Sequence, residues 1–244
     1  MTELNIPIYY INLEKSTERN DNMIAQLKNY NYTRFPAIDT NHIIFKKYND
    51  LDKSKYMYDS RKLACLLSHL YAIKKAYDNN LENIIIFEDD IDLTIFNQVY
   101  HKTTRLFSKL INTEILQLFT SHDEFYNRPH KLIRIEHTTN MWGACGYIIN
   151  SKGIKKIMDL YSYIYDKFDI VNYNNNYLSD LLLYDICNTL TFNVPFINLR
   201  PPSIYPSTLD NDINDIGINL QKNINYINSI SDDIIKIIEE ADIL

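Results

Sequence analysis

The sequence has few glycines, few cysteines and no surplus of positive charge. Of its 244 residues, 4 are glycine and 3 are cysteine, and Cys65, Cys145 and Cys187 lie far apart without a CxxC pair. This spacing argues against a zinc cluster or a disulfide framework and is typical of reduced thiols in a core. The formal net charge of -6 provides no broad basic surface for a phosphate backbone, so nucleic-acid binding is not expected as the main role.

Long hydrophobic runs are also missing. No stretch reaches the length of a membrane span, and the amino terminus lacks the basic segment, apolar run and cleavage site of a signal peptide. We therefore expect a cytoplasmic protein without a transmembrane segment. Hydrophobic residues make up 45% of the chain and charged residues 23%, which is typical of a folded globular protein with a core of its own.

Strand-like and helix-like segments alternate along the chain. Short apolar runs predict strands over residues 6–12, 32–38, 84–87, 115–119, 131–136, 147–150 and 196–199. Helical spacing of apolar residues predicts helices that begin at Ser16 and Ser151 and others over residues 61–77, 94–110 and 177–190. This alternation predicts an α/β fold with a mostly parallel central sheet flanked by helices.

Two further segments do not fit the alternation. Residues 39–59 are polar and aperiodic, and a loop of this length in a compact domain usually has a function. Residues 211–244 begin with an Asn- and Asp-rich stretch and continue with isoleucines at helical spacing. We expect residues 1–210 to form one domain and residues 211–244 a helical extension that packs on it or on a partner subunit, so a homodimer is possible.

An acidic triplet is the strongest local signal. The apolar run 84–87 leads directly into Glu88, Asp89 and Asp90. Ligands of α/β sheets bind beyond the carboxyl ends of the strands, and three consecutive acids there concentrate negative charge that a cation can offset. Carboxylate oxygens suit Mg²⁺ or Mn²⁺, which neutralise charge on a departing nucleoside diphosphate. A solvated acidic turn is the alternative, and phosphatases and kinases also place acids at this position.

Other motifs surround the triplet in a fixed order. They are Tyr10-Ile11-Asn12-Leu13 followed by Arg19, Pro36-Ala37-Ile38-Asp39, Ala64-Cys65-Leu66-Leu67-Ser68-His69, Phe87-Glu88-Asp89-Asp90, and Trp142-Gly143-Ala144-Cys145-Gly146-Tyr147-Ile148-Ile149. In order and spacing they resemble glycosyltransferase family 25, which contains bacterial lipooligosaccharide galactosyltransferases and the galactosyltransferase domains that modify collagen. The resemblance extends over roughly residues 6–200.

The resemblance implies a GT-A fold, a Rossmann-like domain that binds a UDP-sugar donor together with Mn²⁺ or Mg²⁺. The residues that it puts near the nucleotide are Asn12, Leu13, Arg19, Glu88 and Asp89. It implies Asp90 as the metal ligand, with Glu88 as a second candidate. For Arg19, a surface position on the first helical turn is the alternative.

His69 and Asp180 are the remaining candidates. Ser68 and His69 are adjacent on a predicted helix, so their side chains point about 100° apart and cannot form a nucleophilic dyad. We expect His69 near the acidic motif as a hydrogen-bonded histidine rather than a metal ligand. An inverting transferase needs a general base, and the family carries an acid followed by apolar residues near Asp180. A helix cap is the alternative for Asp180.

The sequence departs from the family pattern at two places. Arg61 and Lys62 stand where the family usually has Gly-Glu, which puts the donor or acceptor preference in doubt. No histidine follows His137, so a later metal or phosphate ligand would have to be a residue such as Arg200, Asp210 or Asp212. Trp142 is the single tryptophan, either a platform for a sugar ring or a core residue.

These features favour transfer of a hexose, galactose or glucose, from a UDP-sugar to a glycan or to a hydroxylated side chain. A degenerate family member that binds nucleotide or glycan without turnover is one alternative, motivated by the altered residues Arg61 and Lys62. A metal-dependent phosphohydrolase is the other, because it would share the acidic triplet.

Overall fold

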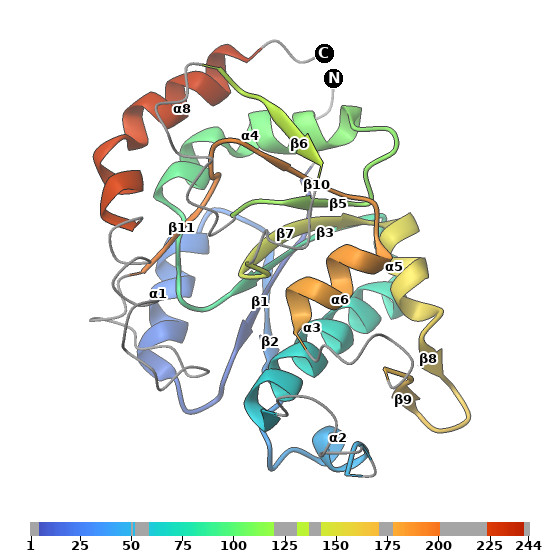
Figure 1. Cartoon of the computed structure of the whole chain (residues 1–244). Helices are drawn as coiled ribbons and strands as arrows, with labels where there is room; N and C mark the ends of the chain where they lie inside the picture. The colour runs from blue at the N-terminus through green and yellow to red at the C-terminus, as the bar shows by residue number, and fades with distance from the viewer. Residues whose placement is uncertain are drawn as a thin grey trace.

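The computed structural model describes residues 5–49, 51, 59–119, 131–136, 143–170, 178–200 and 224–241. In these residues a central sheet lies between two layers of helices (Figure 1). Trp142, His137, Asp210 and Asp212 lie outside the described residues.

The central sheet has seven strands in the order β2-β1-β3-β7-β5-β10-β6. Their bounds are β1 (Ile8–Asn12), β2 (Tyr32–Pro36), β3 (Asn83–Glu88), β5 (Ile115–Gln117), β6 (Arg134–Glu136), β7 (Gly146–Asn150) and β10 (Thr189–Phe192). β1 pairs in parallel with β2 and β3, and β10 with β5. β7 runs antiparallel between β3 and β5, and β6 is antiparallel to β10. The predicted α/β fold with a mostly parallel sheet is therefore confirmed.

The helices cover both faces of the sheet. They are α1 (Thr17–Leu27), α2 (Ile43–Lys46), α3 (Ser60–Asp78), α4 (Thr94–Lys109), α5 (Ser151–Met158), α6 (Ser179–Ile186) and α8 (Ser231–Glu240), and residues 224–229 are also helical. Two cores result, one beneath α3, α5 and α6 and the other beneath α1, α4 and α8. In β3, Ile84 and Ile86 enter the first core while Ile85 and Phe87 enter the second, which explains why this strand is continuously apolar.

Two small antiparallel pairs complete the described structure. β4 (Ile91–Asp92) pairs with β11 (Asn198–Leu199), and β8 (Tyr161–Ser162) pairs with β9 (Lys167–Phe168). The first pair fixes the chain just after the acidic triplet, because the amide of Arg200 also donates to the carbonyl of Asp90 at 2.8 Å. The second pair is a hairpin that projects beside α3 and α5 (Figure 1).

Three sequence predictions of secondary structure were wrong in part. The helix predicted over 177–190 ends at Ile186, and Thr189–Phe192 forms β10, because this β-branched and aromatic run is buried against β5. The predicted loop 39–59 contains α2, whose first turn is capped by the His42 side chain on the amide of Ile44. The strand predicted over 196–199 is limited to β11 and lies outside the central sheet.

The carboxyl-terminal segment packs within the chain. Ile227, Ile234 and Ile238 are fully buried in the core that α4 covers, and Lys102 donates to the carbonyl of Glu239 at 2.9 Å. The isoleucine spacing seen in the sequence thus serves an intramolecular contact. In the part of the chain that the structure describes, no helix has the length and apolar character to cross a bilayer.

Candidate functional site

A cavity of about 330 Å³ lies beyond the carboxyl ends of β1 and β3. These two strands are parallel neighbours, and Ile11 pairs with Glu88, so their ends are level. The cavity walls come from five places: the end of β1 with Leu13 and Lys15 after it, residues 37–40 after β2, the first half of α3, Arg19 on α1, and the acidic triplet. The fold therefore brings Arg19, Leu13, His69 and the triplet together as predicted.

Asp89 is held by two neighbouring side chains. Asn12 Nδ2 donates to Asp89 Oδ2 at 2.6 Å, and Arg19 Nη1 donates to Asp89 Oδ1 at 2.8 Å. All three residues are buried. Burial raises the pKa of Asp89, against the opposing effects of Arg19 and Asn12. Asn12 and Arg19, predicted at the nucleotide, thus have a first role in neutralising and orienting Asp89 on the cavity wall.

Asp90 is less fully paired than Asp89. Its Oδ2 lies 3.7 Å from Arg19 Nη1, while its Oδ1 is buried and has no hydrogen-bond partner among the described residues. Burial and the charge of Glu88 raise the pKa of Asp90 to about 7, although Arg19 opposes this. An unpaired buried carboxylate oxygen is costly unless a further partner, such as a cation, completes the site.

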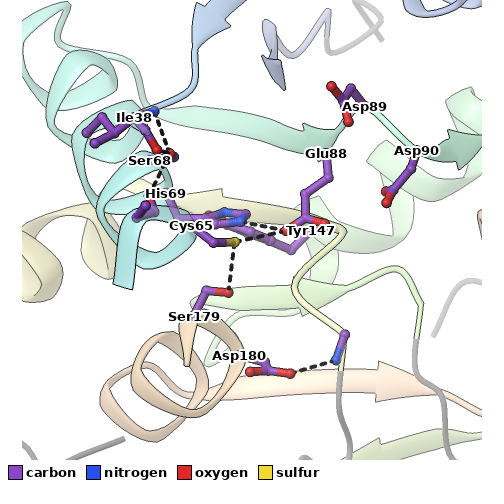
Figure 2. Close-up of polar contacts among 12 residues, drawn as sticks. Ile38, Cys65, Ser68, His69, Glu88, Asp89, Asp90, Tyr147, Ser179 and Asp180 are labelled. Atoms are coloured by element: carbon purple, nitrogen blue, oxygen red, sulfur yellow. Dashed lines mark hydrogen bonds and ion pairs between the residues drawn. The ribbon is translucent and has the colours of Figure 1, made fainter. Parts of the chain in front are cut away.

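Glu88 points toward α3 and away from Asp89 (Figure 2). Its Oε1 lies 3.0 Å from His69 Nε2 and accepts a hydrogen bond from Cys65 Sγ at 3.5 Å. Burial alone would raise the pKa of Glu88, but the contacts with His69 and Cys65 and the charge of Arg19 leave it lowered. Glu88 is therefore an ionised carboxylate on the wall of the cavity.

His69 connects Glu88 to β7. It is fully buried, and its Nδ1 lies 3.1 Å from the hydroxyl of Tyr147. Both contacts are satisfied when Tyr147 donates to Nδ1 and the Nε2 proton is donated to Glu88. The sequence prediction of a hydrogen-bonded histidine near the acidic motif agrees with this geometry. The roles of Tyr147 and Cys65 were not predicted, although both residues stand in the motifs that surround the triplet.

The hydroxyl of Ser68 forms hydrogen bonds that stabilise the fold and is not available for catalysis. Its hydroxyl accepts from the amide of Ile38 at 2.8 Å and donates to the carbonyl of Ala64 at 2.8 Å. It ties α3 to the segment after β2 and so helps to form one wall of the cavity (Figure 2).

Asp180 lies in the first turn of α6, and its side chain fixes the backbone of Gly143 through a hydrogen bond. Its Oδ2 accepts from the amide of Gly143 at 3.1 Å, and the hydroxyl of Tyr184 donates to the Gly143 carbonyl at 2.9 Å. Gly143 has φ of 123°, and a Cβ there would lie 3.2 Å from the carbonyl oxygen of Phe119. The capping position of α6 is Leu178, so Asp180 is not the helix cap. Burial raises its pKa.

Gly146 also stands at a position where a side chain would clash with its neighbours. A Cβ at this position would lie 2.3 Å from Ile197 Cδ1 and 3.0 Å from Phe87 Cδ1. Both glycines therefore stand where the backbone lies close to neighbouring residues. Arg61, which departs from the family pattern, lines the cavity and pairs with Asp59, the N-cap of α3, at 3.2 Å.

Comparison with known proteins identifies the family. A family model described as "Glycosyltransferase family 25 (LPS biosynthesis protein)" matches residues 5–172. The chain belongs to glycosyltransferase family 25. The match covers β1, the acidic triplet and β7, which together form the cavity and its supporting contacts.

Two curated relatives are similar over part of the chain. A protein of Haemophilus influenzae named "Putative glycosyltransferase" is 28% identical over 163 residues, which are 62% of this chain and 56% of the relative. The "Lacto-N-neotetraose biosynthesis glycosyltransferase LgtB" of Neisseria meningitidis serogroup B is 28% identical over 112 residues, 41% of this chain and 39% of the relative. The chain thus matches about half or less of the length of these relatives.

Proposed function

We propose that this family 25 chain transfers a hexose, galactose or glucose, from a UDP-sugar to a hydroxyl group of a glycan or of a hydroxylated side chain, with the help of a divalent cation. Family membership and the names of both relatives support glycosyl transfer. The observation that carries the proposal is the unpaired, buried Oδ1 of Asp90 in the cavity beyond β3, which has no partner among the described residues.

The acidic wall fits a hard divalent cation. Asp90 and Glu88 would hold Mn²⁺ or Mg²⁺, because carboxylate oxygens are their preferred ligands and Arg19 already neutralises Asp89. The bound cation would supply charge neutralisation for the diphosphate leaving group. Asn12 and Arg19 would keep Asp89 fixed at the nucleotide, and Leu13 would contact the base and ribose from the end of β1.

His69 would maintain the direction of Glu88. With the Nε2 proton donated to Glu88 Oε1, the second carboxylate oxygen remains available toward the cavity. Cys65 adds a second donor to the same Oε1. In this proposal α3 does not touch the reacting atoms but fixes a carboxylate that does.

Asp180 is the proposed general base, and its substitution tests that role. Asp180→Asn keeps an oxygen that can accept from the Gly143 amide but cannot take a proton from the acceptor hydroxyl. We expect kcat to fall about 10²- to 10⁴-fold while UDP-sugar affinity is unchanged. Asp185→Asn, the same change at an exposed acid of α6, is the control. A kcat for Asp180→Asn close to that of the control would instead assign Asp180 to holding the Gly143 backbone.

Titration calorimetry with UDP-, GDP- and CMP-sugars tests the donor site. We expect one UDP-sugar to bind with Mn²⁺, to lose affinity in excess chelator, and to lose it in Asp90→Ala. Failure of every nucleotide sugar to bind would reject the transferase proposal and favour a degenerate glycan-binding protein. Release of phosphate from a phosphomonoester would favour a phosphohydrolase.

A further inference from the structure

The β8–β9 hairpin presents three consecutive exposed hydrophobic side chains at its tip. Tyr163, Ile164 and Tyr165 are 68%, 89% and 70% exposed, respectively. Ile164 has the highest exposure among the large hydrophobic residues that the structure describes. Single exposed hydrophobic residues are common on soluble proteins, but a contiguous group usually marks an interaction site.

Hydrogen bonds and ring contacts at the base of the hairpin keep its tip pointing away from the rest of the protein. The Asp166 carboxylate accepts from Lys47 Nζ and from the Tyr161 hydroxyl, and the hydroxyl of Tyr71 donates to the Asp166 carbonyl at 3.3 Å. Asp166 itself has φ of 49°, which reverses the chain at this point. Phe168 and Tyr161 pack in the core with Tyr71. The exposed tip is therefore supported by an ordered base with contacts to α2 and α3.

The shape of the tip limits its partner. The hairpin projects from the edge of the molecule beside α2 and α5 (Figure 1). A narrow projecting tip can insert into the surface of a lipid bilayer, whereas a typical protein–protein interface needs a broad complementary surface. Tyrosine has an apolar ring and a polar hydroxyl, which suits the boundary between lipid headgroups and hydrocarbon. Ile164, between the two tyrosines, would reach deepest.

Positive charge surrounds the hairpin although the whole chain is acidic. Residues 41–49, 71–78 and 151–170, which include the hairpin and the segments in contact with it, hold eight lysines and four aspartates. The net charge of the whole chain is -6. Two of the lysines lie over tyrosine rings at the hairpin base, Lys74 at 5.0 Å from Tyr161 and Lys167 at 5.8 Å from Tyr48. Lysines at this position complement anionic headgroups.

We propose that the β8–β9 tip is a membrane-docking site that inserts Tyr163, Ile164 and Tyr165 into the surface of an anionic lipid bilayer. The surrounding lysines contact the headgroups, and the chain associates reversibly from one face. This docking does not require glycosyl transfer, so it can be tested without nucleotide or cation.

Sedimentation with lipid vesicles tests the proposal. The full chain is mixed, in buffer with chelator, with vesicles of phosphatidylcholine alone or with added phosphatidylglycerol. We expect binding to the anionic vesicles that weakens with salt, and at least about a tenfold loss of affinity in the triple variant Tyr163→Ser, Ile164→Ser, Tyr165→Ser. The control is Ile111→Ser, because Ile111 is 83% exposed elsewhere and should bind as the wild type does.

Two further measurements distinguish insertion from adsorption to the headgroups and from self-association. Ile164→Trp should show a blue shift of its fluorescence with anionic vesicles and quenching by brominated lipid, and Lys46→Glu should lower affinity about fivefold. The circular-dichroism spectrum and urea unfolding of the triple variant should match those of the wild type, which would show an intact fold. Equal vesicle binding by wild type and triple variant, or none by wild type, would overturn the proposal. So would a triple variant that changes only the oligomeric state, since the tip would then be a self-association surface.

Discussion

Asparagine in place of Asp90 is expected to lower the rate of glycosyl transfer about 10²- to 10³-fold. The substitution retains the size of the side chain but removes the charge that would hold the cation. Because burial and Glu88 already raise the pKa of Asp90, loss of this charge should not destabilise the cation-free fold. The measurement is release of UDP from the donor found by calorimetry, at saturating and limiting Mn²⁺.

Asp39→Asn is the matched control, because Asp39 is another acid that lines the same cavity. Its Oδ1 accepts from the amide of Asn41 at 2.8 Å, a bond that asparagine can also make. We expect this variant to remain within about threefold of the wild-type rate. A similar large loss in both variants would mean that overall cavity charge, not a ligand at Asp90, supports the reaction.

The pH dependence of cation binding provides an independent check on Asp90. Its pKa in the cation-free protein is about 7, so below that pH a proton competes with the cation. The apparent Kd for Mn²⁺ should therefore rise as pH falls below about 7, by about tenfold per unit at most for one competing proton. Affinity that is constant from acid to neutral pH would exclude Asp90 as a ligand.

Much of the fold could be predicted because the sheet is covered on both faces. The apolar run 84–87 predicted a buried strand, and β3 contributes side chains to both cores, as β1, β5 and β7 also do. β10 was missed because Thr189–Phe192 directly follows a helix with only a short break, and sequence periodicity cannot distinguish the two over so few residues. The pairing of β7 antiparallel to β3 was not predicted, since strand direction depends on the path of the intervening chain.

The site could be predicted at the level of which residues meet, but not at the level of their hydrogen bonds. The apolar run that directly precedes Glu88, Asp89 and Asp90 predicted that these three acids lie at the end of a strand. It could not indicate that Asp89 is paired with Arg19 while Glu88 turns toward His69. That division depends on side-chain geometry across strands and helices that are far apart in the sequence. It also shows why three adjacent acids need not share one role.

Removal of the Arg19 charge should have the largest effect on stability. Arg19→Met leaves Asp89 buried without its ion pair and removes a neutralising charge from Asp90. Loss of one partner of a buried pair costs about 3–5 kcal/mol, and the side chains of Arg19 and Asp89 are each only 10% exposed. Urea unfolding of the cation-free chain at pH 8 measures this loss. Arg19→Lys, which retains a positive charge, should lose about half as much.

The same loss should depend on pH in a defined direction. Burial raises the pKa of Asp89 even with Arg19 present, and without Arg19 the pKa must rise further. A carboxyl group whose folded-state pKa lies above its unfolded value of about 3.9 loses stability as pH rises from the unfolded to the folded pKa. Arg19→Met should therefore be destabilised less at pH 5 than at pH 8, because the folded protein then retains a proton on Asp89. An equal loss at both pH values would mean that Arg19 contributes packing rather than charge.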